Sequence, residues 1–107
     1  MERAWRHSSA VIGVYADSGQ VGYMRIVSDR ATFAWLCDVF VDPEYRGRGI
    51  ARAMVAFALQ HPDHQGLRQF LLATSDAHGV YASLGFNAIT SPERWMQYRP
   101  PGNQPAP

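Results

Sequence analysis

The sequence predicts a single domain of the α/β (α+β) class, in which helices pack on a β-sheet. Its 107 residues leave room for one hydrophobic core. Apolar residues make up 47% of the chain and charged residues 18%, a balance typical of globular rather than disordered proteins. Runs of β-forming residues and helical segments follow in the order ββ, β, α, β, α, ββ. We therefore expect one domain over residues 1–99 and a disordered tail over residues 100–107, which hold four prolines.

The first half of the chain reads as a short helix followed by three strands. Residues 2–8 form a helical lead-in, and residues 10–16 are rich in β-forming side chains. Turn chemistry at residues 17–20 predicts a hairpin whose second arm covers residues 20–27. Residues 31–41 are mostly apolar, which predicts a central strand buried on both faces.

The second half begins where Asp42 and Pro43 end that strand. A helix is expected over about residues 48–60, with His61-Pro62 after it. Its apolar stripe at three- and four-residue spacing consists of Ile50, Ala51, Met54, Val55, Ala58 and Leu59.

The remaining elements alternate between strand and helix. Residues 70–74 predict another buried strand. Asp76 is expected to cap a short helix that runs to about residue 84 and ends at Gly85. Residues 86–89 and 95–98 predict two short closing strands.

The overall composition excludes several classes of function. A net charge of +1 gives no electrostatic reason to expect a nucleic-acid partner. Cys37 is the single cysteine, which excludes an internal disulfide and fits a reducing cytoplasm. The sequence has no apolar run of about 18 residues and no signal-peptide core. We expect a soluble cytoplasmic protein with no membrane partner.

Residues 46–49, Arg-Gly-Arg-Gly, have the composition of an anion-binding loop. Glycines let a ligand approach the backbone N–H groups because no Cβ is in the way. The start of a helix adds unpaired N–H groups and the positive end of its dipole, about half a unit charge. Arg46, Arg48 and Arg52 add full positive charges. The segment therefore predicts a site for a phosphate or pyrophosphate group.

Three kinds of phosphate loop can be compared with this segment. The P-loop requires a lysine, and this chain has none. The dinucleotide fingerprint G-x-G-x-x-G/A would use Gly47 and Gly49 but would place Arg52 where a small residue must pack. The third pattern, R/Q-x-x-G-x-G/A, fits residues 46–51 at every position.

Together with residues 39–45, this third pattern resembles the GNAT superfamily of N-acetyltransferases. A second marker of that family, Y-x-x-x-G-F, matches residues 81–86. The resemblance covers about residues 3–99. It implies a GNAT fold, a mixed central sheet with splayed parallel strands and flanking helices, and acetyl-CoA as the acetyl donor.

The resemblance also implies which residues bind the cofactor. In the family, the pantetheine arm lies like an extra strand in the gap between the two parallel strands. Val39, Phe40 and Val41 would offer backbone groups to the acetyl and pantetheine part, although they would also suit an ordinary core strand. The amides expected to bind the pyrophosphate belong to Arg46, Gly47, Arg48, Gly49, Ile50 and Ala51.

The three arginines carry different expectations. Arg46 occupies the motif position and is expected to shape the loop. Arg48 and Arg52 are four residues apart on the expected helix, so a solvated pair and contact with a CoA phosphate are equally compatible with the sequence.

For catalysis, the resemblance implies that Tyr81 donates a proton to the departing CoA thiolate, because a tyrosine stays protonated at neutral pH. A core aromatic in a short helix is the alternative. The backbone N–H of Val41 would hold the developing oxyanion. Asp38 leads the candidates for a general base, ahead of Glu44 and His78. Structural hydrogen bonding of Asp38 and a proton relay through water remain open.

Other chemistry-bearing residues have plainer interpretations. Burial in a strand is expected for Cys37 rather than a nucleophilic role. His61, Asp63 and His64 are expected in a solvated loop, and no metal site is predicted. Trp5, Trp35 and Trp95 fit either a substrate pocket or the core.

The chain is shorter than the family norm and is expected to lack the usual first strand and helix. That portion normally walls the acceptor site and covers the edge of the strand at residues 10–16. We therefore expect a homodimer or a truncated natural protein. The predicted function is transfer of the acetyl group of acetyl-CoA to a primary amine by direct attack. A non-catalytic CoA-binding module, or one half of a dimeric enzyme, is the alternative.

Overall fold

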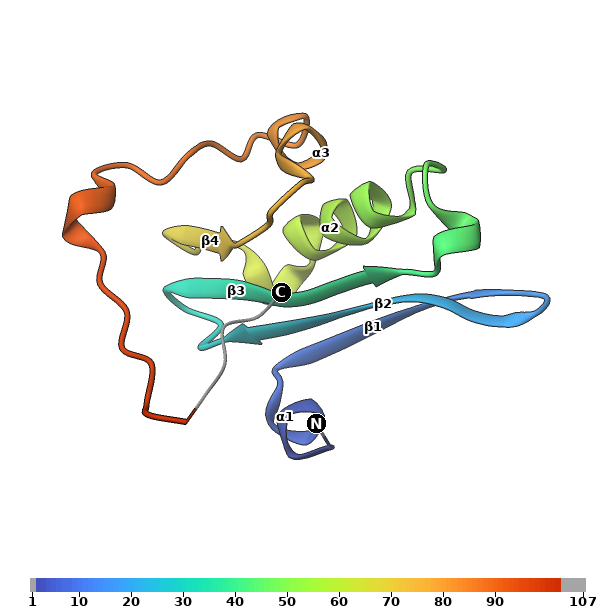
Figure 1. The fold of residues 1–107 in the computed structure, drawn as a ribbon, viewed down its shortest axis with the longest axis horizontal. Coiled ribbons are helices and arrows are strands. Elements are labelled where there is room, and N and C mark those ends of the chain that lie inside the picture. The colour runs from blue at the N-terminus through green and yellow to red at the C-terminus, as the bar shows by residue number, and fades with distance from the viewer. Residues whose placement is uncertain (1, 103–107) are drawn as a thin grey trace.

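The computed structural model describes residues 2–102 and shows a four-stranded mixed sheet with helices on both faces (Figure 1). The strands are β1 (Ala10–Ala16), β2 (Gly19–Ser28), β3 (Phe33–Val41) and β4 (Gln69–Leu72), and they lie in this order across the sheet. The first three strands are antiparallel, whereas β3 and β4 are parallel. The predicted mixed sheet is therefore confirmed.

Two helices lie on one face of the sheet and a third lies on the other (Figure 1). The long helix α2 (Ile50–Gln60) and the short helix α3 (His78–Ala82) share the upper face in this view, and α1 (Glu2–His7) lies below. Three 3₁₀ turns complete the elements: η1 (Pro43–Tyr45), η2 (Pro62–His64) and η3 (Pro92–Arg94).

The core lies between the sheet and α2. Met24 and Ile26 from β2 are fully buried against Met54 and Val55 of α2. Their spacing follows from geometry, since alternate residues of a strand and residues three or four apart on a helix share one face. At roughly 25 cal/mol per Å² of buried apolar surface, this contact is the main term that holds the helix on the sheet.

The opposite face of the sheet corrects one prediction. Residues 31–41 were expected to be buried on both sides, but Phe33 and Trp35 are exposed, and Trp35 keeps 51% of its surface accessible. Leu36, which points to the other side, is buried. Apolar side chains of this run point to both faces of the sheet, but at this end of β3 the described elements cover only the face that carries Leu36. The buried strand predicted at residues 70–74 corresponds to β4, which is only half buried and ends at Leu72.

The closing strands predicted at residues 86–89 and 95–98 are wrong. Both segments are irregular, and η3 lies between them. Ser91 adopts a left-handed φ of 55° and Pro92 starts the turn, which bends the chain away from an extended path. The disordered tail was predicted for residues 100–107, of which residues 103–107 lie outside the described residues.

Two helix boundaries also differ from expectation. Helix α2 begins at Ile50 rather than 48, because Gly49 has φ of 79° and interrupts the helix there. Asp76 does not cap α3 as predicted, because the N-cap is Ala77 and no side chain caps it. The Thr74 hydroxyl accepts hydrogen bonds from the N–H groups of Asp76 and Ala77 at 3.4 and 3.1 Å, in the turn before the helix. Gly85 does end that segment, with φ of 102°, as predicted.

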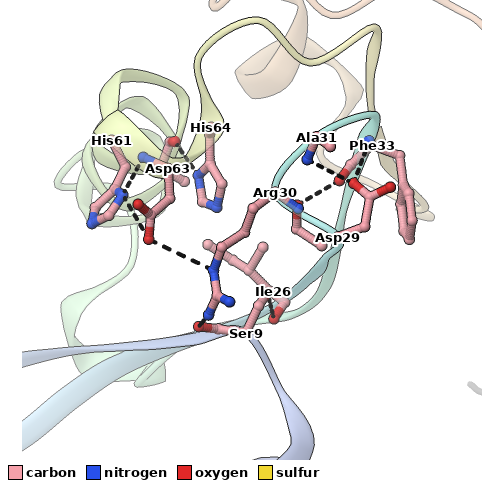
Figure 2. A network of polar contacts seen from close by, with 11 residues as sticks. Ser9, Ile26, Asp29, Arg30, Ala31, Phe33, His61, Asp63 and His64 are labelled. Atoms are coloured by element: carbon pink, nitrogen blue, oxygen red, sulfur yellow. Dashed lines mark hydrogen bonds and ion pairs between the residues drawn. The ribbon is translucent and has the colours of Figure 1, made fainter.

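A polar network fastens the end of the sheet where β3 begins (Figure 2). Asp29 accepts hydrogen bonds from the backbone N–H groups of Ala31, Thr32 and Phe33. Arg30 reaches across to the Ser9 carbonyl at 3.1 Å and pairs with Asp63 at 3.7 Å. These contacts join the β2–β3 turn, the start of β1 and the loop after α2.

Candidate active site

The candidate site lies where β3 and β4 separate. Their parallel pairing covers Phe33–Leu36 and Gln69–Leu72, and β3 continues to Val41 beyond that register. A cavity of about 270 Å³ opens in this place. Its walls are formed by Tyr23, Leu36, Cys37, Asp38, Val39, Phe40, Leu72, Ala73, Thr74 and Tyr81.

A β-bulge precedes the point of separation. Arg25 lies opposite Asp38 and Ile26 lies opposite Leu36, so Cys37 is an extra residue in β3. Such a bulge bends the strand and redirects its side chains. Here it places Asp38 beside Arg25 on the face of the sheet away from α2, and it turns β3 away from β4.

The backbone of β3 presents polar groups to the gap. Asp42 donates its N–H to the Val21 carbonyl at 2.7 Å, so the alternation of an antiparallel pair directs the N–H groups of Val39 and Val41 away from β2. The backbone of Phe40 faces β2, and its carbonyl closely approaches Gly22. Of the three residues predicted to offer backbone contacts, Val39 and Val41 have the required direction and Phe40 does not.

The Arg-Gly-Arg-Gly loop joins η1 to α2. Gly47 and Gly49 both have φ of 79°, a left-handed conformation that favours glycine. A Cβ built on either glycine would meet nothing within 4 Å. Gly49 is the N-cap of α2 and provides no side-chain cap, so the first N–H groups of the helix remain available to a ligand. The Arg46 amide, which was predicted to bind the pyrophosphate, instead donates to the Pro43 carbonyl at 3.4 Å.

The three arginines of this segment point in different directions. Arg46 donates from Nε to the Val41 carbonyl at 3.0 Å, which fixes the loop to the end of β3. Arg48 lies over the Tyr45 ring at 4.7 Å, before the helix begins. Arg52 donates to Ser83 Oγ at 3.1 Å and so links α2 to the residue that follows α3. Arg48 and Arg52 therefore do not form the helical pair that the sequence suggested.

Tyr81 belongs to both the core and the cavity wall. It is 8% exposed, packs in the core cluster with α2 and meets Phe86 edge to face at 6.1 Å. Burial, with a smaller contribution from the charge of Asp76, raises the pKa of the Tyr81 hydroxyl above its ordinary value. A hydroxyl in this position stays protonated at neutral pH and can donate a proton into the cavity.

Asp38 is engaged by a neighbouring side chain. Its Oδ2 accepts from Arg25 Nε at 2.8 Å. The same hydrogen bond raises the pKa of Arg25, so the guanidinium remains charged. Glu44 and His78, the other base candidates, are not among the residues that line the cavity.

Sequence reasoning missed Tyr23 and Thr74 as residues of this site. Tyr23 packs edge to face on Phe40 at 5.2 Å, and strand alternation in residues 20–27 was the available signal. Thr74 lies between β4 and α3, and its hydroxyl accepts the Ala77 N–H at 3.1 Å, a turn that a hydroxyl just before a short helix could have indicated.

The remaining chemistry-bearing residues take structural positions. Burial raises the pKa of the Cys37 thiol, and Cys37 lines the cavity as the bulge residue. His64 is buried and hydrogen-bonds the Ala58 carbonyl at 2.7 Å (Figure 2). Across residues 2–102 no three His, Cys, Asp or Glu side chains gather as metal ligands would. Trp35 and Trp95 are both about half exposed, and the side chain of Trp5 is not among those that the structure describes.

None of the helices within residues 2–102 is long and apolar enough to cross a membrane.

The fold places the chain in a known class, an α/β domain with a mixed sheet whose two parallel strands pair only in part. Residues 7–88 match the family model described as the acetyltransferase (GNAT) domain. The chain belongs to the GNAT acetyltransferase family.

Individual relatives agree with this assignment. The crystal structure of a GNAT-family protein from Xanthomonas campestris superposes with a TM-score of 0.85 and 50% identity, covering 94% of this chain and 70% of that one. Thialysine N-ε-acetyltransferase from Sus scrofa is 35% identical over 69 residues, or 61% of this chain and 41% of that protein. An aminoglycoside N-acetyltransferase in complex with CoA shares the fold, with a TM-score of 0.63 and 22% identity over 85% of this chain and 66% of that one. The chain thus spans less than half the length of the curated relatives it matches.

Proposed function

We propose that the protein transfers the acetyl group of acetyl-CoA to a primary amine by direct attack of the amine on the thioester. The observation that carries this proposal is the gap between β3 and β4. The glycine loop and the uncapped start of α2 follow β3 in the chain, after η1. A pyrophosphate on that loop directs the pantetheine arm along the free edge of β3.

The backbone supplies the groups that hold the cofactor. The N–H groups of Gly47, Gly49 and Ala51 suit a pyrophosphate, since they lie in or beside a left-handed turn and a helix start. The N–H of Val39 would bind the pantetheine arm. The N–H of Val41 would bind the thioester oxygen, where removal of one oxyanion donor typically costs about 3–4 kcal/mol.

Tyr81 would protonate the CoA thiolate as it leaves. Attack by the neutral amine forms the C–N bond, and collapse of the tetrahedral intermediate breaks the C–S bond. The thiolate takes the tyrosine proton, the nitrogen loses its extra proton to water, and Tyr81 regains a proton from water, so the net products are the amide and CoA thiol. We assign the proton of the nitrogen to water and leave Asp38 paired with Arg25.

Release of CoA from acetyl-CoA tests the proposal when it is measured against a panel of primary amines. The panel should include thialysine, after which the matching proteins from Sus scrofa, Mus musculus and Bos taurus are named. We expect amine-dependent CoA release that Tyr81→Phe lowers by about a hundredfold, the usual scale of general-acid catalysis. CoA release that no amine increases would contradict the proposal.

A non-catalytic CoA-binding module is the second candidate. The exposure of Phe33 and Trp35 favours it, because the described residues leave that face of β3 open to water. Tight binding of acetyl-CoA without transfer to any amine would support this candidate over the first.

We further propose that the protein pairs with a second copy of itself in the cytoplasm. β1 is an edge strand of seven residues with no charged side chain, and Tyr15 on it is 71% exposed. Natural edge strands are usually protected by charges, prolines or a covering element. Light scattering after size-exclusion chromatography should give twice the monomer mass, whereas a monomer at micromolar concentration would contradict the pairing.

A further inference from the structure

The cavity between β3 and β4 has a polar wall on the face of the sheet away from α2. Met24 and Ile26 point into the core, so Tyr23 and Arg25, which alternate with them, lie on the other face of β2. Tyr23 lies opposite Phe40 in the register, and Arg25 lies opposite Asp38. An aromatic pair and an ion pair therefore lie next to each other on this face.

Asp38 is the charged member of the cavity lining. The other nine lining residues are aliphatic or aromatic, or carry a hydroxyl or a thiol. A primary amine is mainly protonated at neutral pH, as the reference pKa of about 10.4 for lysine shows. A carboxylate at the wall is the group that an incoming ammonium would contact.

Arg25 forms an ion pair with Asp38 and neutralises its charge. Its Nε holds Oδ2 at 2.8 Å, and its Nη1 donates to Ser8 Oγ at 3.4 Å, so the guanidinium is fixed beside Asp38. The side chains of Arg25 and Asp38 are 18% and 33% exposed, which limits screening by solvent. Oδ2 of Asp38 thus serves Arg25, and Asp38 still lines the cavity, while the pair as a whole carries no net charge.

We propose that Asp38 docks the acceptor as an ammonium ion and that Arg25 restricts the acceptor to amines with a single positive charge and an apolar body. The neutral ion pair gives a second ammonium nothing to bind, and the Tyr23–Phe40 pair suits an aliphatic or aromatic chain. This inference rests on the proposed acetyl transfer, and it makes Arg25 a specificity-determining residue. The bound ammonium loses one proton to water before it attacks.

A binding experiment that needs no turnover tests this proposal. The protein with CoA is titrated with pentylamine, 1-pentanol and 1,5-diaminopentane, and the shifts of its NMR signals are followed. We expect pentylamine to bind about tenfold or more tightly than 1-pentanol, as for a hydrogen bond between charged groups. We also expect no preference for the diamine over the monoamine. Equal binding of pentylamine and 1-pentanol, or no binding of either, would overturn the proposal.

Variants separate the two side chains. Asp38→Asn should abolish the preference for pentylamine over 1-pentanol, whereas Glu93→Gln, an equal change of charge on exposed η3, should leave it intact. Arg25→Met should raise the affinity for the diamine relative to pentylamine at low salt, because the wall then carries a net negative charge. An unchanged ratio of diamine to monoamine affinity in Arg25→Met would overturn the role of Arg25.

Acetyl-CoA binding is measured on each variant. An unaltered affinity shows that the variant is folded with an intact cofactor site. If the unmodified protein did not bind acetyl-CoA, the proposed function itself would be wrong. If it bound acetyl-CoA but did not prefer pentylamine, only the acceptor proposal would be wrong.

Discussion

Gly49 turns the chain from the anion-binding loop into α2, with φ of 79° and ψ of 14°. The Gly49→Ala change should reduce both stability and cofactor affinity, for two separable reasons. A left-handed alanine costs about 1–2 kcal/mol, and each kcal/mol lowers the Tm of a domain of this size by about 4–8 °C. The new Cβ would meet no protein atom within 4 Å, so no steric clash adds to that cost.

The effect on affinity comes from the ligand side of the loop. The added Cβ lies where a pyrophosphate must approach the N–H groups of Gly49 and its neighbours. Losing one or two hydrogen bonds to a charged phosphate costs about 3 kcal/mol, which is roughly a hundredfold in Kd. Isothermal titration with acetyl-CoA measures this loss, and we expect a micromolar Kd for the unmodified protein.

Gly66→Ala is the matched control. Gly66 also has φ of 79° and open space around its missing Cβ, but it lies after η2 and outside the cavity. It should lose about as much stability as Gly49→Ala and keep the affinity for acetyl-CoA. If both variants bound acetyl-CoA like the unmodified protein, the glycine loop would not be the pyrophosphate site.

Three further changes have defined outcomes. Tyr81→Phe should lower kcat and leave the Kd for acetyl-CoA unchanged. Because burial raises the pKa of Tyr81, the activity of the unmodified protein that depends on Tyr81 should persist to pH values above 10, as a pH–rate profile would show. Asp29→Asn should flatten the acid dependence of the Tm, because hydrogen bonds from the Thr32 hydroxyl and from nearby backbone N–H groups hold the pKa of Asp29 below its usual range. The stabilisation from Asp29 is therefore present above about pH 4 and is lost as the pH falls further. An equally steep loss of Tm in the variant would contradict this. Thr74→Val should cost about 1 kcal/mol by removing the hydroxyl that accepts hydrogen bonds from the Asp76 and Ala77 N–H groups before α3, which chemical denaturation measures against Thr90→Val at an exposed position.

The sequence predicted well those elements whose bounds are set by nearby turn residues or glycines. β1 has the expected bounds, because alternating β-forming residues end at turn chemistry. Gly47, Gly49 and Gly85 all have the positive φ that glycine permits, and the two motifs they belong to are the ones that carry the family resemblance.

The elements that depend on a partner were predicted less well. Residues 86–89 and 95–98 have strand-like composition, but β-propensity reflects packing against neighbours rather than a backbone preference. Met96 is 96% exposed, so this segment has no such packing here. The burial of residues 31–41 on both faces was wrong for the same reason, since nothing in a strand says which of its faces will be covered.

The bulge at Cys37 had no signal in the sequence, and it organises the candidate site. Strand alternation without it would have put Asp38 on the core face with Leu36. The pairing of Asp38 with Arg25 is a contact between residues 13 positions apart, which only the register of β2 and β3 determines. The cofactor loop could therefore be predicted from sequence, whereas the acceptor side of the cavity required the structure.

The central claim is that acetyl-CoA binds across the glycine loop and the gap between β3 and β4, and a crystal structure with bound CoA tests it most directly. The pyrophosphate should accept hydrogen bonds of about 2.7–3.2 Å from the N–H groups of Gly47, Gly49 or Ala51. The pantetheine arm should lie along Val39 and Val41, with its sulfur facing Tyr81. CoA bound away from α2, or a pyrophosphate without contact to these N–H groups, would contradict the claim.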